Sequence, residues 1–201
     1  SNFHRCSMSK FFVVVGAMDG IRHSNFGQRV LDNPDWSGLM IEPVKYYYDK
    51  LRTKFDRDNI ILENIAIDSR SGIKDIYTID PRLVEQGLVP EWADGISTFN
   101  PDQTAMKSLR DYSYQEKVTC STMEDVVTKH NIKNIDILHI DTEGHDYIVF
   151  EQIWQLGFRP KEIVIEVVSL KLEPYMILLM CLVNTGYEIK RIGDDIRAFH
   201  D

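Results

Sequence analysis

Residues 135–153 read IDILHIDTEGHDYIVFEQI, and this stretch decides the fold of the chain. Its first six residues form an apolar run rich in isoleucine, which is typical of a buried β-strand rather than a helix. Four ionisable side chains then follow within six positions: Asp141, Glu143, His145 and Asp146. Ligands bind beyond the carboxyl ends of strands in open α/β sheets, so these charges predict a functional site. The alternative is a solvated loop with Asp146 as the helix cap, but a cap needs one such residue and not four. We therefore expect Asp146 to cap the helix and the other three residues to form the site.

The bulk composition limits the class of protein. A chain of 201 residues with 43% hydrophobic and 27% charged residues is typical of one globular domain. Its net charge of −8 argues against nucleic acid or an anionic membrane surface as the main partner. The most apolar segment, residues 175–183, is too short to span a membrane and predicts a buried helix. The scattered cysteines Cys6, Cys120 and Cys181 and the lack of a signal-peptide pattern predict reduced thiols in a cytoplasmic protein.

The rest of the chain alternates between strand and helix patterns. We expect strands at residues 11–15, 38–41, 60–67, 74–79, 117–120, 135–140, 162–168, 187–192 and 196–200. We expect one helix that ends near residue 31 and four more at residues 44–55, 122–130, 146–156 and 173–184. A capping box is expected at residues 121–124. This order predicts an α/β fold with a mostly parallel sheet and helices on both faces. It also predicts that residues 74–79 pair back antiparallel on the third strand, and that residues 193–195 close a C-terminal antiparallel hairpin.

The domain organisation is simple. Residues 1–201 are expected to form a single domain, with residues 1–10 as an N-terminal extension. Residues 80–114 are irregular and contain Pro81, Pro90 and Trp92, which is typical of a lid or binding loop or of a poorly ordered insertion.

Two other strand ends carry the features of a nucleoside site. Gly16 and Gly20 follow the first strand, where they allow a tight turn and close approach to a ligand, or form only a structural turn. Glu42 stands at the tip of the second strand, which Pro43 stops, and its carboxylate can accept hydrogen bonds from ribose hydroxyls. The GxGxxG pattern of dinucleotide-binding proteins is absent. This absence disfavours an NAD-dependent oxidoreductase.

The segments FVVVGAMDG, GLMIEP, ENIAID, ISTF, STMEDVV and IDILHIDTEGHDYIVFEQI occur in this order along the chain. Together they resemble the FkbM family of S-adenosylmethionine-dependent methyltransferases, from about residue 11 to about residue 168. The resemblance implies a Rossmann-like class I methyltransferase fold, with a mostly parallel seven-stranded sheet whose last strand is inserted antiparallel. It also implies O-methylation of a hydroxyl on a sugar, a glycan or a natural-product-like small molecule.

The resemblance also assigns roles to individual residues. It implies that S-adenosylmethionine is bound by Gly16, Ala17, Met18, Asp19 and Gly20 around the methionine and ribose, by Glu42 and Pro43 at the ribose diol, and by Ala66, Ile67 and Asp68 beside the adenine. It implies that Asp141, Glu143 and His145 face the methyl group and the acceptor as catalytic residues. The family pattern departs at His139 and Thr142, which stand where a lysine and a valine are usual. The insertion at residues 80–114 would lie on the acceptor side.

The acceptor hydroxyl must lose a proton, and the sequence leaves two ways to achieve this. His145 has the side chain best suited to act as a base near neutral pH, although it could instead orient the loop. Asp141, Glu143 and Glu166 could alternatively hold Mg²⁺, for which carboxylate oxygens are suitable ligands. The first way needs no metal.

The acceptor and the oligomeric state are not specified by any pattern. Trp92, Tyr112 and Tyr114 could stack on a sugar or serve as packing anchors, and Ser97 and Thr98 could contact a ligand or the local backbone. A second hypothesis, from another functional class, is an inactive S-adenosylmethionine-binding domain that serves as a partner-binding module. Mutation of Asp141 or His145 would affect turnover only under the enzymatic hypothesis.

Overall fold

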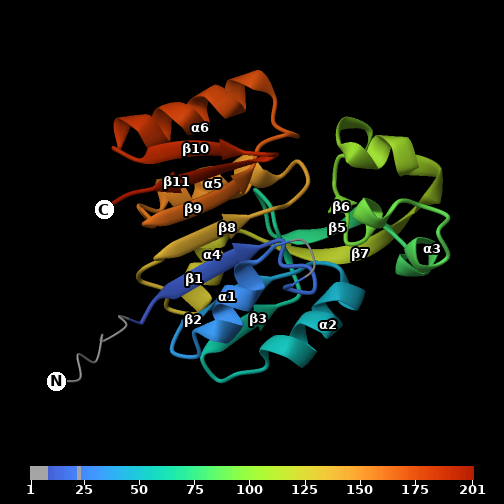
Figure 1. Ribbon diagram of the computed structural model, residues 1–201, viewed down its shortest axis with the longest axis horizontal. Coiled ribbons are helices and arrows are strands. Elements are labelled where there is room, and N and C mark those ends of the chain that lie inside the picture. The colour runs from blue at the N-terminus through green and yellow to red at the C-terminus, as the bar shows by residue number, and fades with distance from the viewer. Residues whose placement is uncertain (1–8, 22–23) are drawn as a thin grey trace.

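The computed structural model describes residues 9–21 and 24–201. Its main sheet has seven strands in the order β10-β11-β9-β8-β1-β2-β3 (Figure 1). Their bounds are β1 Phe11–Val15, β2 Ser37–Ile41, β3 Ile60–Glu63, β8 Ile137–Ile140, β9 Glu162–Glu166, β10 Glu188–Ile192 and β11 Asp195–Phe199. The last strand, β11, is inserted antiparallel between β9 and β10, and the pairings among the other strands are parallel. The predicted class I methyltransferase fold and C-terminal hairpin are confirmed.

The central strand β1 sets the level at which its neighbours end. Val15, the last residue of β1, pairs with Ile41 at the end of β2 and with Ile140 at the end of β8. Backbone bonds continue this alignment, since the amide of Gly16 donates to Ile41 and the amide of Asp141 donates to Val15. The chain therefore leaves three adjacent strands at one edge of the sheet.

Helices cover both faces of this sheet because the side chains of β1 alternate. Phe12 and Val14 pack in a core with residues of α1 (Phe26–Asp32) and α2 (Lys45–Phe55). Val13 and Val15 pack in a second core on the opposite face. This second core contains residues of α4 (Met123–Lys129), α5 (Asp146–Gln155) and α6 (Leu172–Asn184).

A second sheet has the strand order β4-β7-β5-β6, and it corrects part of the sequence prediction. Its strands are β4 Ala66–Ile67, β5 Gly72–Ile79, β6 Ser97–Thr98 and β7 Ser113–Ser121. The predicted strand at residues 60–67 is wrong, because β3 and β4 belong to different sheets. The side-chain amide of Asn64 donates to the carbonyls of Glu42 and Pro43, which holds the chain at the break. The predicted partner of β5 is also wrong, since β5 pairs antiparallel with β7 and β6 rather than with the third strand.

The insertion at residues 80–114 is more ordered than its composition suggests. It contains α3 (Pro81–Glu85), β6 and three short 3-10 helices: η1 Glu91–Ala93, η2 Pro101–Gln103 and η3 Ala105–Tyr112. A small core of its own includes Val89, Ile96, Met106 and Leu109 packed with Ile79 of β5. Figure 1 shows this segment beside the carboxyl edge of the main sheet.

Two helix predictions need correction. Helix α6 is not fully buried, because Leu172, Met180 and Val183 are 76%, 58% and 61% exposed, whereas Leu178 and Leu182 are buried. The start of α4 is capped by Thr122, whose hydroxyl accepts from the amide of Asp125, and not by Ser121. The predicted capping box of α4 therefore starts one residue too early.

Within the described part of the chain, every helix is too short or too polar to cross a membrane. Cys120 and Cys181 are both free thiols, and Cys120 is buried. Cys6 and most of the predicted N-terminal extension lie outside the described residues.

Candidate active site

A cavity of about 380 Å³ opens where β1, β2 and β8 end. Of the ten residues predicted to bind the cofactor, all but Asp68 line it: Gly16, Ala17, Met18, Asp19, Gly20, Glu42, Pro43, Ala66 and Ile67. The predicted acceptor-side residues Asp141, Glu143, His145 and Glu166 line it as well. The structure thus brings both predicted groups to one cavity, whose volume lies within the usual range of small-molecule sites.

The glycine turn after β1 (residues 16–20) packs directly against the acidic loop after β8 (residues 141–145). Gly16 has φ +84°, and a Cβ atom there would lie 1.8 Å from the carbonyl oxygen of Asp141. The amides of Gly16 and Ala17 both donate to the carbonyl of Ile41 at the end of β2. Glycine at position 16 is therefore required by the backbone conformation and by the close approach.

Glu42 is held rigidly at the tip of β2. Its side chain is buried, and its two oxygens accept from the amides of Met18 at 2.7 Å and Val44 at 3.0 Å. Burial raises the pKa of Glu42 to about 7, although these two hydrogen bonds act to lower it. Each carboxylate oxygen has two lone pairs, so each can accept a further hydrogen bond from a ligand hydroxyl.

Asp19 is a second buried carboxylate of this turn, and it supports the turn. One of its oxygens accepts from the amide of Ile21 at 3.0 Å, and the other pairs with Nζ of Lys54 of α2 at 3.1 Å. The turn after β1 is thereby tied to the helix that follows β2.

Three carboxylates gather at the ends of β8 and β9. Asp141, Glu143 and Glu166 each offer an oxygen atom, and these atoms lie within 4.8 Å of one another. Burial, followed by the nearby carboxylates, raises the pKa of Glu143 to about 8. Burial and a hydrogen bond with Asp141 also raise the pKa of Glu166 strongly. A proton shared between Asp141 and Glu166 is the simplest way to reduce their repulsion.

Asp146 has a different role from the predicted one. It is the first residue of α5, and His145 occupies the cap position without a side-chain capping bond. The fully buried carboxylate of Asp146 accepts from the amides of Thr142 at 2.7 Å and Gly144 at 3.0 Å. It therefore folds the loop back on itself, with Glu143 at φ +49°. The prediction of a simple cap is wrong because the helix begins at Asp146 itself.

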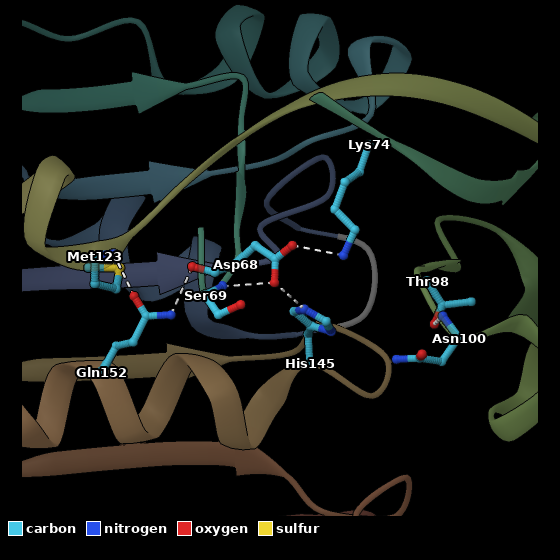
Figure 2. Close-up of polar contacts among 8 residues, drawn as sticks. All are labelled: Asp68, Ser69, Lys74, Thr98, Asn100, Met123, His145 and Gln152. Carbon is cyan, nitrogen blue, oxygen red and sulfur yellow. Dashed lines mark hydrogen bonds and ion pairs between the residues drawn. The ribbon is translucent and has the colours of Figure 1, made fainter. Parts of the chain in front are cut away.

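His145 lies between the cavity and the second sheet. Its Nε2 atom is 3.0 Å from Oδ1 of Asp68, and the side chains are 9% and 8% exposed (Figure 2). Its Nδ1 atom is buried and has no hydrogen-bond partner among the described residues. Asp68, predicted to flank the adenine, does not line the cavity, because its side chain turns to His145 and Lys74.

The insertion contacts the acidic loop through Thr98. The hydroxyl of Thr98 donates to the carbonyl of Glu143 at 2.7 Å and accepts from the amide of Asn100 at 3.0 Å. Thr98 thus contacts the loop backbone, while Ser97 lines the cavity. The indole of Trp92, which is 50% exposed, also lines the cavity.

Other residues of the site were not predicted. Asp94 and Gly95 line the cavity from the insertion, and the hydroxyl of Tyr47 binds both of them at 2.7 Å. Asp194 and Asp195 line it from the hairpin, because Asp195 pairs with Glu166 of β9. The only hint in the sequence is that two aspartates are adjacent in the hairpin. Their position at the cavity follows from the pairing of β11 with β9.

Two of the predicted stacking residues lie elsewhere. Tyr112 and Tyr114 do not line the cavity and instead surround a separate depression with Tyr46 and Arg82. Of the three aromatic side chains considered for an acceptor, only Trp92 is in position to contact a ligand in the main cavity.

A comparison with protein families matches residues 15–189 to the methyltransferase FkbM domain. The chain belongs to the FkbM methyltransferase family. It is therefore an S-adenosylmethionine-dependent methyltransferase by family, and the matched residues include the glycine turn and the acidic loop and end at the start of β10.

Solved structures resemble this FkbM domain at low sequence identity. The METTL16 methyltransferase domain is 11% identical with a TM-score of 0.49, and the match covers 98% of this chain and 63% of that one. A fibrillarin/Nop5p complex is 14% identical with a TM-score of 0.46, covering 96% and 73%. A human methyltransferase 10 domain containing protein is 11% identical with a TM-score of 0.45, covering 100% and 76%. These likenesses carry no functional argument. A search of curated proteins finds no match.

The glycine turn gives a first prediction. Gly16→Ala should abolish detectable binding of S-adenosylhomocysteine in calorimetric titration and lower the Tm, because the new Cβ meets the Asp141 carbonyl. Gly157→Ala is the matched control, since Gly157 also has a positive φ of +89° but nothing lies within 4 Å of its Cβ position. The control should lose only about 1 kcal/mol from backbone strain and keep its affinity. Equal binding by the two variants would contradict the role of the turn.

The acidic cluster gives a second prediction, about stability and pH. Since the folded-state pKa of Glu143 is raised, its contribution to stability is present at low pH and is lost as the pH rises through about 8. Glu143→Gln removes this penalty. Between pH 6 and pH 9 in EDTA, the variant should gain about 2 kcal/mol of unfolding free energy relative to the wild type.

The measurement for this second prediction is urea unfolding at both pH values. Glu124→Gln is the control, because Glu124 is exposed on α4. It should show the same pH dependence as the wild type. A Glu143→Gln variant that follows the wild type at every pH would show that Glu143 carries no buried charge at high pH.

Proposed function

We propose that this FkbM protein transfers a methyl group from S-adenosylmethionine to a hydroxyl of a sugar, a glycan or a natural-product-like small molecule. The observation that carries the proposal is the buried Nδ1 atom of His145, which has no partner among the described residues in a cavity that also contains the glycine turn. Hydroxyl methylation needs a base, and the lone pair of this nitrogen is taken up by no hydrogen bond among the described residues.

The residues on the cofactor side suit S-adenosylmethionine. The turn at residues 16–20 presents backbone to the cavity, and Glu42 retains acceptor capacity for a ribose diol. Ala66 and Ile67 supply a small apolar surface that suits an adenine ring. When bound, the cofactor supplies an electrophilic methyl group on a sulfonium, which leaves readily.

The residues on the acceptor side suit a polyhydroxylated molecule. Nδ1 of His145 would take the proton of the reacting hydroxyl. The hydroxyl oxygen would meanwhile bond to the methyl carbon as the bond from that carbon to sulfur breaks. Asp141 and Glu143 would accept hydrogen bonds from neighbouring hydroxyls and so orient the acceptor. The exposed face of Trp92 at the cavity would stack on a sugar ring.

We further propose that the three carboxylates act through shared protons and need no metal. The hydrogen bond between Asp141 and Glu166 supports this proposal. The competing arrangement is a divalent cation such as Mg²⁺ on Asp141, Glu143 and Glu166, whose oxygens lie close enough together to hold one.

Methyl transfer gives a third prediction. Incubation of the wild type with deuterium-labelled S-adenosylmethionine and a panel of sugars and glycans should yield a methylated product, detected by mass spectrometry. His145→Gln should lower kcat at least about 100-fold, because glutamine cannot take the proton, and should leave the affinity for S-adenosylhomocysteine unchanged. His130→Gln, at a histidine that does not line the cavity, should keep full activity.

The outcomes of that experiment separate the two functional classes. Binding of S-adenosylhomocysteine without transfer to any hydroxyl compound would favour the alternative, an inactive cofactor-binding domain that serves as a partner-binding module. Failure to bind S-adenosylhomocysteine would contradict both hypotheses.

A fourth prediction concerns the metal. Transfer by protein treated with EDTA should proceed at the untreated rate, because protons rather than a cation neutralise the carboxylates. A rate that falls with EDTA and returns with added Mg²⁺ would assign Asp141, Glu143 and Glu166 to a metal site instead.

We also propose that the protein works in a reducing compartment such as the cytoplasm. The free thiols of Cys120 and Cys181 support this assignment.

A further inference from the structure

We propose that Asp68 is a positioning residue for His145. Its carboxylate accepts a hydrogen bond from Nε2–H of the imidazole and thereby leaves the lone pair of Nδ1 free for the acceptor hydroxyl. The inference rests on the proposed hydroxyl methylation, and it moves Asp68 from the adenine side of the site to the acceptor side.

The contact between the two residues is short and enclosed. Nε2 of His145 and Oδ1 of Asp68 are 3.0 Å apart, across 77 positions of sequence. Both residues are buried, at 8% and 6% exposure. In such surroundings water competes weakly for the hydrogen bond, so the bond fixes the orientation of the ring.

Asp68 is itself held from several sides, as Figure 2 shows. Its carboxylate accepts from the amide of Ser69 and from Nζ of Lys74, each at 2.8 Å. Its backbone carbonyl accepts from Nε2 of Gln152 of α5 at 2.9 Å. The other end of that amide accepts from the backbone amide of Met123 of α4 at 2.8 Å. The carboxylate therefore has one position, set by α4, α5 and β5.

These donors decide which nitrogen of His145 carries the proton. Burial acts to raise the pKa of Asp68, but the hydrogen bonds from Lys74, His145 and Ser69 outweigh it and lower the pKa to about 2. An ionised carboxylate only accepts hydrogen bonds, so Nε2 must be the protonated nitrogen of a neutral ring. The remaining lone pair is then on Nδ1, the atom without a partner among the described residues.

The ring is also fixed by an aromatic contact. The centroids of Phe99 and His145 lie 4.9 Å apart with their planes tilted by 58°. Nζ of Lys74 lies 4.4 Å from the centroid of Phe99. Lys74 therefore supports both the carboxylate and the ring that border the imidazole. A buried imidazole nitrogen left unpaired costs free energy, and a bound hydroxyl would recover it.

The kinetic test uses Asp68→Asn. We expect kcat to fall at least about tenfold, because the amide no longer selects the productive tautomer, while the KM for S-adenosylmethionine stays within about twofold. The matched control is Glu63→Gln. Glu63 also accepts from a lysine and a histidine, Nζ of Lys129 at 2.6 Å and Nε2 of His130 at 2.5 Å, away from the cavity. It should keep wild-type kinetics.

The second test does not depend on activity. In ¹⁵N-histidine-labelled wild-type protein, with the His145 signals assigned from the His145→Gln variant, NMR should show a protonated Nε2 and an unprotonated Nδ1 in the neutral ring. Asp68→Asn should shift the ring toward the other tautomer. A wild-type ring protonated on Nδ1, or a ring unaffected by Asp68→Asn, would overturn the inference.

The kinetic outcomes are equally decisive. An unchanged kcat in Asp68→Asn would overturn the inference. A raised KM for S-adenosylmethionine with unchanged kcat would overturn it too, and would return Asp68 to the cofactor side. If the wild type methylates no hydroxyl compound, the proposed function fails, and the NMR result still decides whether Asp68 sets the tautomer.

Discussion

The parallel pairing of β1 with both β2 and β8 is the constraint on which the site depends. Because Val15, Ile41 and Ile140 end in register, the glycine turn, Glu42 and the acidic loop emerge at one edge. The contact of Gly16 with the Asp141 carbonyl then leaves no room for a side chain between the turn and the loop. A shift of one residue in the β1–β2 pairing would displace Glu42, and a shift in the β1–β8 pairing would displace the acidic loop; either would turn the side chains of the shifted strand to the other face.

Bringing these carboxylates together in the cavity destabilises the folded state electrostatically. Buried or half-buried carboxylates with raised pKa, among them Glu42, Glu143 and Glu166, favour protonation over charge. Such groups disfavour the folded state as the pH rises, which a purely structural site would avoid. Asp68 shows the opposite case, because three donors keep its pKa low. The cavity is therefore lined by carboxyl groups that favour protonation, whereas the carboxyl group that contacts His145 favours its ionised form.

The sequence predicts the parts of the site that lie at strand ends and fails where long-range pairing decides. Gly16, Glu42 and Asp141 were found because a buried strand, its terminating residue and the following polar residues are adjacent in the chain. The break between β3 and β4 depends on the Asn64 amide, and the partner of β5 begins 41 residues beyond the start of β5. The prediction that Asp146 caps α5 fails because the helix starts one residue earlier than a cap at this position requires. No local pattern could pair Asp68 with His145.

The second sheet supports the proposed acceptor side of the cavity, although its strands are separate from the main sheet. Asp68 follows β4, Lys74 lies on β5 and Thr98 lies on β6. Through them the second sheet holds the His145 ring on one side and the Glu143 carbonyl on the other. The same sheet carries the insertion with Trp92, which lines the cavity. If His145 acts as the proposed base, changes in the insertion that alter acceptor choice would also move it, and specificity and rate would be coupled.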